Sequence, residues 1–149
     1  MKNDKVDILL VEDNKYDVIA FERALKNRSV PNPLHVATDG MEALEFLRGE
    51  AGRPKINQPY VVLLDLNMNR MNGFEFLDEI RKDEMLQRSV VFVLTTSEAD
   101  VDKTKAYNFH VAGYLSKNEA GTEFLNVFDT LDPYFTNVHF PPEDAVADC

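Results

Sequence analysis

Polar side chains suited to a metal or phosphate site follow four of the short apolar stretches in this sequence. Glu12 and Asp13 follow the first stretch, Asp65 the third, Thr95 the fourth and Lys117 the fifth. In an open parallel α/β sheet, the carboxyl ends of the strands lie along one edge, and ligands bind there. If these stretches are strands of such a sheet, three carboxylates, a hydroxyl and an ammonium converge at one place.

These side chains together suit phosphoryl transfer supported by a divalent cation. Neighbouring carboxylates repel one another by ~1–4 kcal/mol per pair, so the group requires a cation or protons. Oxygen ligands with room for water favour Mg²⁺ or Mn²⁺ over Zn²⁺. A lysine can meet an anion as a point charge. We therefore predict that Asp65 is a nucleophile towards phosphorus, with Lys117 and Thr95 beside it.

The elements that would position these residues alternate along the chain. Short runs rich in Val, Ile and Leu predict strands buried on both faces. Helical patterns lie between them and after the last one. The expected strands cover residues 6–11, 34–37, 60–64, 90–94 and 111–115, and the expected helices cover 15–27, 40–48, 73–87, 99–109 and 119–135. This alternation predicts an α/β fold, an open parallel sheet with helices on both faces.

Length and composition exclude several other classes of protein. The chain has 149 residues, a formal net charge of −10 and one cysteine. The excess of acidic over basic residues does not favour nucleic acid or an anionic membrane as a partner. A single cysteine cannot form a disulfide within the chain. No apolar run approaches the ~20 residues of a membrane-spanning helix, and no signal peptide is recognisable. We expect a cytoplasmic protein.

The chain has the length of one domain. We expect that domain to cover residues 1–136, because the helical and strand patterns dissolve beyond it. Residues 137–149 are then a short C-terminal tail, and no effector domain follows. The tail is either packed back through Val138 and Phe140 or frayed.

Several segments around the polar residues resemble the receiver domain of two-component response regulators. Residues 10–14 are similar to the acidic pair of that family, and residues 64–68 with Gly73 to its phosphoacceptor segment. Thr95 and Lys117 lie 30 and 52 residues after Asp65, as the hydroxyl and lysine of the family do. The resemblance covers about residues 5–136. Residues 39–44, 49–59 and 94–97 further resemble small stand-alone regulators that partner bacterial phytochromes and other sensor kinases.

This resemblance implies a flavodoxin-like fold with strand order 2-1-3-4-5 and a signalling switch. A sensor histidine kinase or phytochrome-type kinase would phosphorylate Asp65, and a histidine phosphotransfer protein is a further partner to consider. The switch would act through the face of the fourth helix, fifth strand and fifth helix. The protein would catalyse only its own phosphorylation and slow dephosphorylation, so we do not expect an enzyme acting on an external substrate.

The resemblance also assigns a role to each site residue. Glu12, Asp13, Asp65 and the backbone carbonyl of Asn67 would hold Mg²⁺ or Mn²⁺. Lys117 and Thr95 would hold the phosphoryl group. Thr95 and Tyr114, which lies three residues before Lys117, would form the switch. No other cofactor is expected.

Two positions depart from the family pattern. Asn69 and Asn118 stand where the family usually has proline. A Lys-Pro bond at the second position is often cis, whereas a cis bond before any other residue costs ~2.5–4 kcal/mol. The bond between Lys117 and Asn118 is therefore either trans, with a reshaped loop, or strained.

Other interpretations stay open at this point. An aspartyl-nucleophile phosphatase would need a second aspartate at position 67, where this chain has asparagine. A flavin or nucleotide binder on the same fold would need a phosphate-cradling loop after the first strand, where residues 12–15 begin with two acidic residues and would repel a phosphate unless a metal intervened. A degenerate receiver would only bind a partner. An apolar stripe near the C-terminus is expected to pack mostly in the core, and a contact between two copies of the chain stays an alternative. The stripe comprises Phe124, Leu125, Phe128, Leu131 and Phe135.

Overall fold

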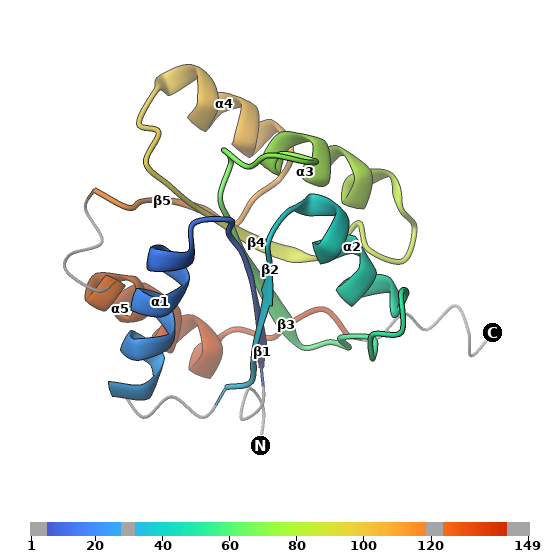
Figure 1. Ribbon diagram of the computed structural model, residues 1–149, viewed down its shortest axis with the longest axis horizontal. Helices are drawn as coiled ribbons and strands as arrows, with labels where there is room; N and C mark the ends of the chain where they lie inside the picture. The colour runs from blue at the N-terminus through green and yellow to red at the C-terminus, as the bar shows by residue number, and fades with distance from the viewer. Residues whose placement is uncertain (1–5, 28–31, 119–123, 143–149) are drawn as a thin grey trace.

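The computed structural model describes residues 6–27, 32–118 and 124–142 of the chain. Five strands and five helices alternate in these residues (Figure 1). The strands are β1 Asp7–Val11, β2 Leu34–Ala37, β3 Tyr60–Leu64, β4 Val90–Thr95 and β5 Gly113–Ser116. The helices are α1 Lys15–Asn27, α2 Gly40–Arg48, α3 Gly73–Lys82, α4 Asp100–Asn108 and α5 Leu125–Asn137. Within the described ranges, none of the helices could span a lipid bilayer.

All five strands are parallel and form one sheet in the order β2-β1-β3-β4-β5. This confirms the fold class and the strand order expected from the sequence. The chain turns in opposite directions from β1, to β2 on one side and to β3 on the other. Such a reversal leaves a crevice at the carboxyl ends of the two central strands, which is where Glu12 and Asp65 occur.

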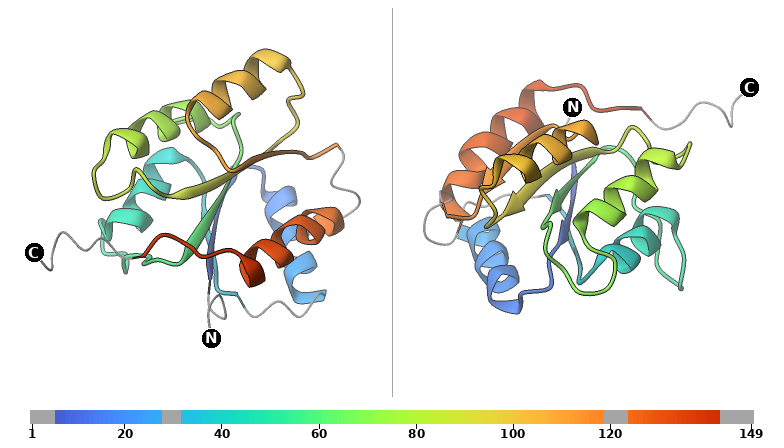
Figure 2. Two further views of the ribbon diagram at one scale, coloured as in Figure 1. Left: turned by 180° about the vertical axis from the view of Figure 1, so that it is seen from behind. Right: turned by 90° about the horizontal axis from the view of Figure 1, so that it is seen from above.

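Helices cover both faces of the sheet, as Figures 1 and 2 show. Helices α1 and α5 lie on one face, and α2, α3 and α4 lie on the other. Strand residues alternate between the two layers: Leu9 and Val62 pack with α2 and α3, whereas Ile8 and Val61 pack with α1 and α5. Burial on both sides explains why the central strands are apolar at consecutive positions.

Several elements differ in their bounds from the expected ranges, α3 and β5 among them. Helix α3 ends at Lys82 rather than 87, because Asp83 breaks the helix and its side chain accepts a hydrogen bond from the N–H of Met85 at 2.8 Å. Strand β5 begins at Gly113 rather than 111, although the N–H of Ala112 already bonds to the carbonyl of Val91 at 2.7 Å. The expected start of the last helix, residues 119–123, lies outside the described residues.

The segment that follows α5 packs back onto the domain. The ring of Phe140 meets Tyr134 edge-on at 5.5 Å, and Tyr134 meets Phe92 of β4 in the same way at 5.1 Å. Of the expected apolar stripe, Phe124, Phe128, Leu131 and Phe135 are buried in the layer of α1 and α5; the Leu125 side chain is not among those described. This stripe is therefore core at the four described positions.

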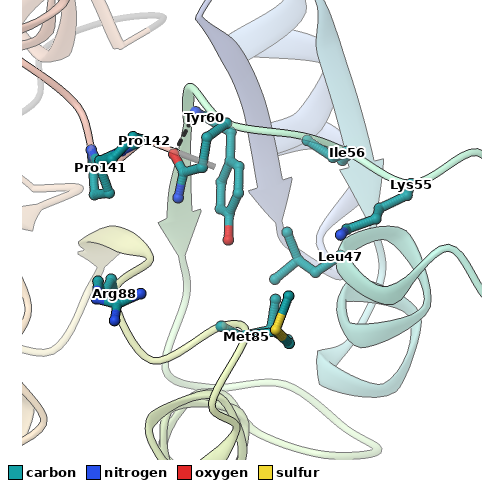
Figure 3. A pocket seen from close by; sticks show the side chains of 10 residues that line it. Leu47, Lys55, Ile56, Tyr60, Met85, Arg88, Pro141 and Pro142 are labelled. Atoms are coloured by element: carbon teal, nitrogen blue, oxygen red, sulfur yellow. Dashed lines mark hydrogen bonds between the residues drawn. The ribbon is translucent and has the colours of Figure 1, made fainter. Parts of the chain in front are cut away.

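A hollow of about 30 Å³ is lined by residues at the start of β3 and in the turn before β4 (Figure 3). This volume admits only about one or two water molecules. Its lining consists of Leu47, Lys55, Ile56, Gln58, Tyr60, Met85, Leu86, Arg88, Pro141 and Pro142. None of the site residues expected from the sequence is among them, so the hollow is not part of that site.

Candidate functional site

The carboxyl ends of the strands bring the expected acidic residues together. Oxygen atoms of Glu12, Asp13 and Asp65 all lie within 4.8 Å of one another. Glu12 and Asp65 are buried at 2% and 7% exposure, whereas Asp13 is exposed. The group therefore opens to solvent beside Asp13 and is closed around the other two carboxylates.

The Asp65 carboxylate is held at both of its oxygens. Its Oδ1 accepts a hydrogen bond from the Thr95 hydroxyl at 2.9 Å and one from the Asn67 N–H at 3.2 Å. Its Oδ2 lies 3.3 Å from the Lys117 ammonium. Thr95 is fully buried, so its hydroxyl approaches Asp65 from the interior of the protein. Sequence reasoning placed all of these side chains near Asp65, and the structure brings them there.

Lys117 lies among three carboxylates. Its Nζ is 2.5 Å from Glu12, 2.8 Å from Asp17 and 3.3 Å from Asp65, and its side chain is only 9% exposed. Burial alone would lower the pKa of Lys117, but its hydrogen bonds to Asp17 and Glu12 outweigh that effect and raise the pKa above its ordinary value. Lys117 is therefore a permanent cation at the site.

Asp17 is the site residue that sequence reasoning missed. It lies in the first turn of α1, and this turn begins directly after the acidic end of β1. The closeness of Asp17 to Glu12 and Asp13 in the sequence was the signal that could have assigned it to the site. Its hydrogen bond to Lys117 spans 100 residues of sequence, so the pairing itself depends on how the fold brings the start of α1 close to the loop after β5.

Burial makes Glu12 harder to ionise. Desolvation is the main cause that raises its pKa to about 7, helped by the charge of Asp65 and opposed by the hydrogen bond from Lys117. Glu12 therefore takes up a proton near neutral pH more readily than an ordinary carboxyl group.

The donor set fits a hard divalent cation. Three carboxylates, those of Glu12, Asp17 and Asp65, pair with the Lys117 ammonium, and Asp13 lies beside Glu12 and Asp65. The atoms that the clustered carboxylates of Glu12, Asp13 and Asp65 offer to an ion are all oxygens. Because Asp13 is exposed, an ion with bound water could enter beside it. Mg²⁺ and Mn²⁺ prefer such ligands, and their charge would offset the carboxylate repulsion.

Tyr114 is hydrogen-bonded to the loop after β4. It is half-buried, and its hydroxyl donates to the Ser97 carbonyl at 2.9 Å. In the parallel pairing, Tyr114 lies beside Val93, two residues before Thr95. Since side chains two apart share a face of a strand, Tyr114 and Thr95 lie on the same side of the sheet, as a coupled pair requires.

The loop after β5 accommodates Asn118 without a cis bond. Gln58–Pro59 is the cis bond in the described part of the chain, so Lys117–Asn118 is trans. The Asn118 amide donates to the Thr96 carbonyl at 3.2 Å and to the Glu98 carboxylate at 2.8 Å. These bonds tie the loop after β5 to the loop after β4, and Lys117 still reaches Asp65.

Gly73 allows the loop that carries Asp65 to close tightly onto α3. Its N–H donates to the Leu66 carbonyl at 3.1 Å. A Cβ atom at this position would lie 2.6 Å from the Asp65 carbonyl oxygen and 2.7 Å from the Leu66 Cα. Both contacts are with backbone, so a side chain here must displace the loop that carries Asp65.

We expect Gly73→Ala to lower the free energy of unfolding by about 1–3 kcal/mol, the usual cost of overpacking. Urea unfolding would measure this loss, with Asn69→Ala in the same loop as the control because Asn69 is exposed. Equal stability of Gly73→Ala and the unchanged protein would show that the close approach at Gly73 is not required.

Known proteins share both this sequence pattern and this structure. Residues 8–129 match the family model described as the response regulator receiver domain. Response regulator Rcp1 of Synechocystis sp. is 38% identical over 128 residues, which cover 86% of this chain and 87% of that protein.

Two solved structures are similar over almost their whole length. The phosphorylated cyanobacterial phytochrome response regulator RcpA has a TM-score of 0.76 and 34% identity, covering 92% of this chain and 99% of that one. The Mn²⁺-bound form of response regulator Rcp1 has a TM-score of 0.77 and 33% identity with the same coverage.

The fold and the acidic site together are those of a signalling domain of the response regulator class. The chain belongs to the response regulator receiver domain family. It is a response regulator of the Rcp1 type and not a classical enzyme. This membership decides against the flavin-binding and phosphatase interpretations.

Proposed function

We propose that Asp65 accepts a phosphoryl group from a phosphohistidine of a sensor kinase and so switches the protein between two signalling states. The observation that carries this proposal is the buried Asp65 carboxylate, bonded at once to the Thr95 hydroxyl and the Lys117 ammonium. Relatives named as phytochrome and bacteriophytochrome response regulators support a phytochrome-type kinase as the partner.

In the proposed transfer, one Asp65 oxygen attacks phosphorus in line with the donor. An O–P bond forms, the N–P bond of the phosphohistidine breaks, and its electron pair goes to the departing imidazole. The product is 4-aspartylphosphate. Lys117 meets a phosphoryl oxygen with its fixed charge, and Thr95 turns its hydroxyl from the Asp65 carboxylate towards another. Most of the catalytic effect is thus positioning and charge stabilisation.

Four groups are proposed to hold Mg²⁺ or Mn²⁺. Asp13 and Asp65 would bind the ion directly, Glu12 through water, and Asn67 through its backbone carbonyl. The Asn67 N–H already bonds to Asp65 at 3.2 Å, so this loop follows the carboxylate closely. The ion would supply positive charge to the phosphoryl oxygens.

Thr95 and Tyr114 are proposed to carry the change away from the site. Movement of Thr95 towards the phosphoryl group would free space on the face of the sheet where Tyr114 lies. Tyr114 would then leave the Ser97 carbonyl, and the surface of α4, β5 and α5 would change.

We also propose how the chain is divided and what it contacts. Residues 1–136 form the receiver, and residues 137–149 form a short tail. A histidine phosphotransfer protein and a second copy of the chain are proposed as further partners, the latter through the same surface of α4, β5 and α5.

We expect labelling of the protein to require a divalent cation. Incubation with a small acyl phosphate and Mg²⁺ should add the mass of one phosphoryl group, and a chelator should reduce the labelling rate at least tenfold because the carboxylates would then repel the donor. Intact-protein mass spectrometry measures both. A gain of several groups, or a rate unchanged by the chelator, would refute the proposal.

A further inference from the structure

The ammonium of Lys117 has no hydrogen-bond donor left for a phosphoryl oxygen. A lysine carries three N–H donors, and the three acceptors around Lys117 are Glu12, Asp17 and Asp65. A phosphoryl group on Asp65 can bond to Lys117 only if one of these acceptors gives up its place.

The three acceptors differ in what they lose on release. The Glu12 side chain is 3% exposed, so without Lys117 its carboxylate would stay buried with no charged partner and only the Asn14 N–H as a donor, which is costly. In the proposed transfer, Asp65 attacks through Oδ1, the oxygen bonded to Thr95, so its Oδ2 becomes the carbonyl oxygen of the acyl phosphate and can keep accepting from Lys117. The Asp17 side chain is 31% exposed, so water can replace its bond to Lys117.

The position of Asp17 also favours a free carboxylate. It lies in the first turn of α1, where the N–H groups at the start of a helix attract negative charge. The hydrogen bonds at this turn run from the N–H groups of Tyr16 and Asp17 to Asn14, at 2.9 and 3.1 Å. The turn is therefore capped by Asn14, and α1 does not need the bond between Asp17 and Lys117 in order to begin.

We propose that Asp17 is a positioning residue that holds Lys117 in the unphosphorylated protein and exchanges with a phosphoryl oxygen when Asp65 is modified. This inference rests on the proposed function of Asp65. Asp17 competes with the phosphoryl group for one N–H, so it weakens the phosphorylated state. Its release also changes the charge exposed at the start of α1, which makes α1 a second surface that reports on the state of Asp65.

Beryllofluoride, an analogue of the phosphoryl group, tests this exchange in the intact protein with saturating Mg²⁺. Removing the competitor in Asp17→Asn should tighten beryllofluoride binding about two- to fivefold, the range of a partly exposed ion pair. Calorimetric titration measures the affinity. Glu22→Gln is the matched control, since it removes one exposed carboxylate from the same helix, and it should bind as the unchanged protein does.

The ¹⁵N resonance of the Lys117 ammonium provides a readout that a merely structural role would not give. It should differ between Asp17→Asn and the unchanged protein without beryllofluoride and coincide once beryllofluoride is bound. Resonances that differ equally in both states, or an affinity that is unchanged or weaker, would overturn the exchange. If the unchanged protein binds no beryllofluoride, the proposed function fails as well, so the two failures are distinguishable.

Discussion

Replacing Asp65 with asparagine is expected to abolish phosphoryl labelling and to make the metal-free protein more stable. Asparagine keeps the shape of Asp65 and can still accept the bond from the Thr95 hydroxyl, but its amide oxygen does not attack phosphorus. The variant also loses repulsion from Glu12 and Asp13 while giving up one attraction to Lys117, and the excess repulsion is worth about 1 kcal/mol. Intact mass and urea unfolding measure the two effects.

A matched variant separates these effects from a general loss of negative charge. Asp78 lies on α3, is 45% exposed and pairs only with Lys82 in the described contacts. Asp78→Asn should therefore label as fast as the unchanged protein and gain no stability. Labelling that persists in Asp65→Asn would exclude Asp65 as the acceptor, and a lower stability of that variant would show that the carboxylates do not repel as inferred.

Lys117→Ala should cause the second-largest effect, on both stability and phosphoryl transfer. Removing one partner of a buried ion pair typically costs about 3–5 kcal/mol, and Lys117 serves three carboxylates at once. Loss of its charge from the developing phosphoryl site should slow labelling about 10²- to 10³-fold. Mg²⁺ binding should be retained, because Lys117 is not one of the proposed metal ligands.

Lys82→Ala serves as the control for Lys117→Ala. Lys82 also pairs with an aspartate but is 68% exposed and lies at the end of α3 that is farther from the Asp65 loop, so its loss should leave labelling unchanged. The labelling rate, followed by intact mass over time, and a calorimetric Mg²⁺ titration are measured on both variants. A large loss of Mg²⁺ affinity in Lys117→Ala would mean that its role has been misassigned.

The fold was predictable where burial alone determines the pattern. The run from Tyr60 to Leu64 is apolar at five consecutive positions and is the fully buried β3, so its strand and bounds follow directly. The end of α3 was not predictable from periodicity, because Leu86 continues the apolar pattern and is buried from a turn instead. There the local hydrogen bonds of Asp83 override the periodicity.

The site was predictable to the extent that it follows strand ends. Glu12, Asp65 and Thr95 lie directly after or at the end of strands, and the rule that parallel strands share a carboxyl edge places them together. Asp17 and Asn118 could not be assigned in this way. Their partners, Lys117 and Glu98, are about 100 and 20 residues distant, and only the packing of α1 and the loops selects these pairs.

Identification of the modified residue tests the central claim most directly. The protein would be labelled with a small acyl phosphate and Mg²⁺, reduced with borohydride, which converts an aspartyl phosphate to homoserine, and then mapped by peptide mass spectrometry. We predict homoserine at position 65 alone. Homoserine at Asp13 or Asp17, or a phosphoryl group that resists borohydride on a hydroxyl such as that of Thr95, would contradict the account.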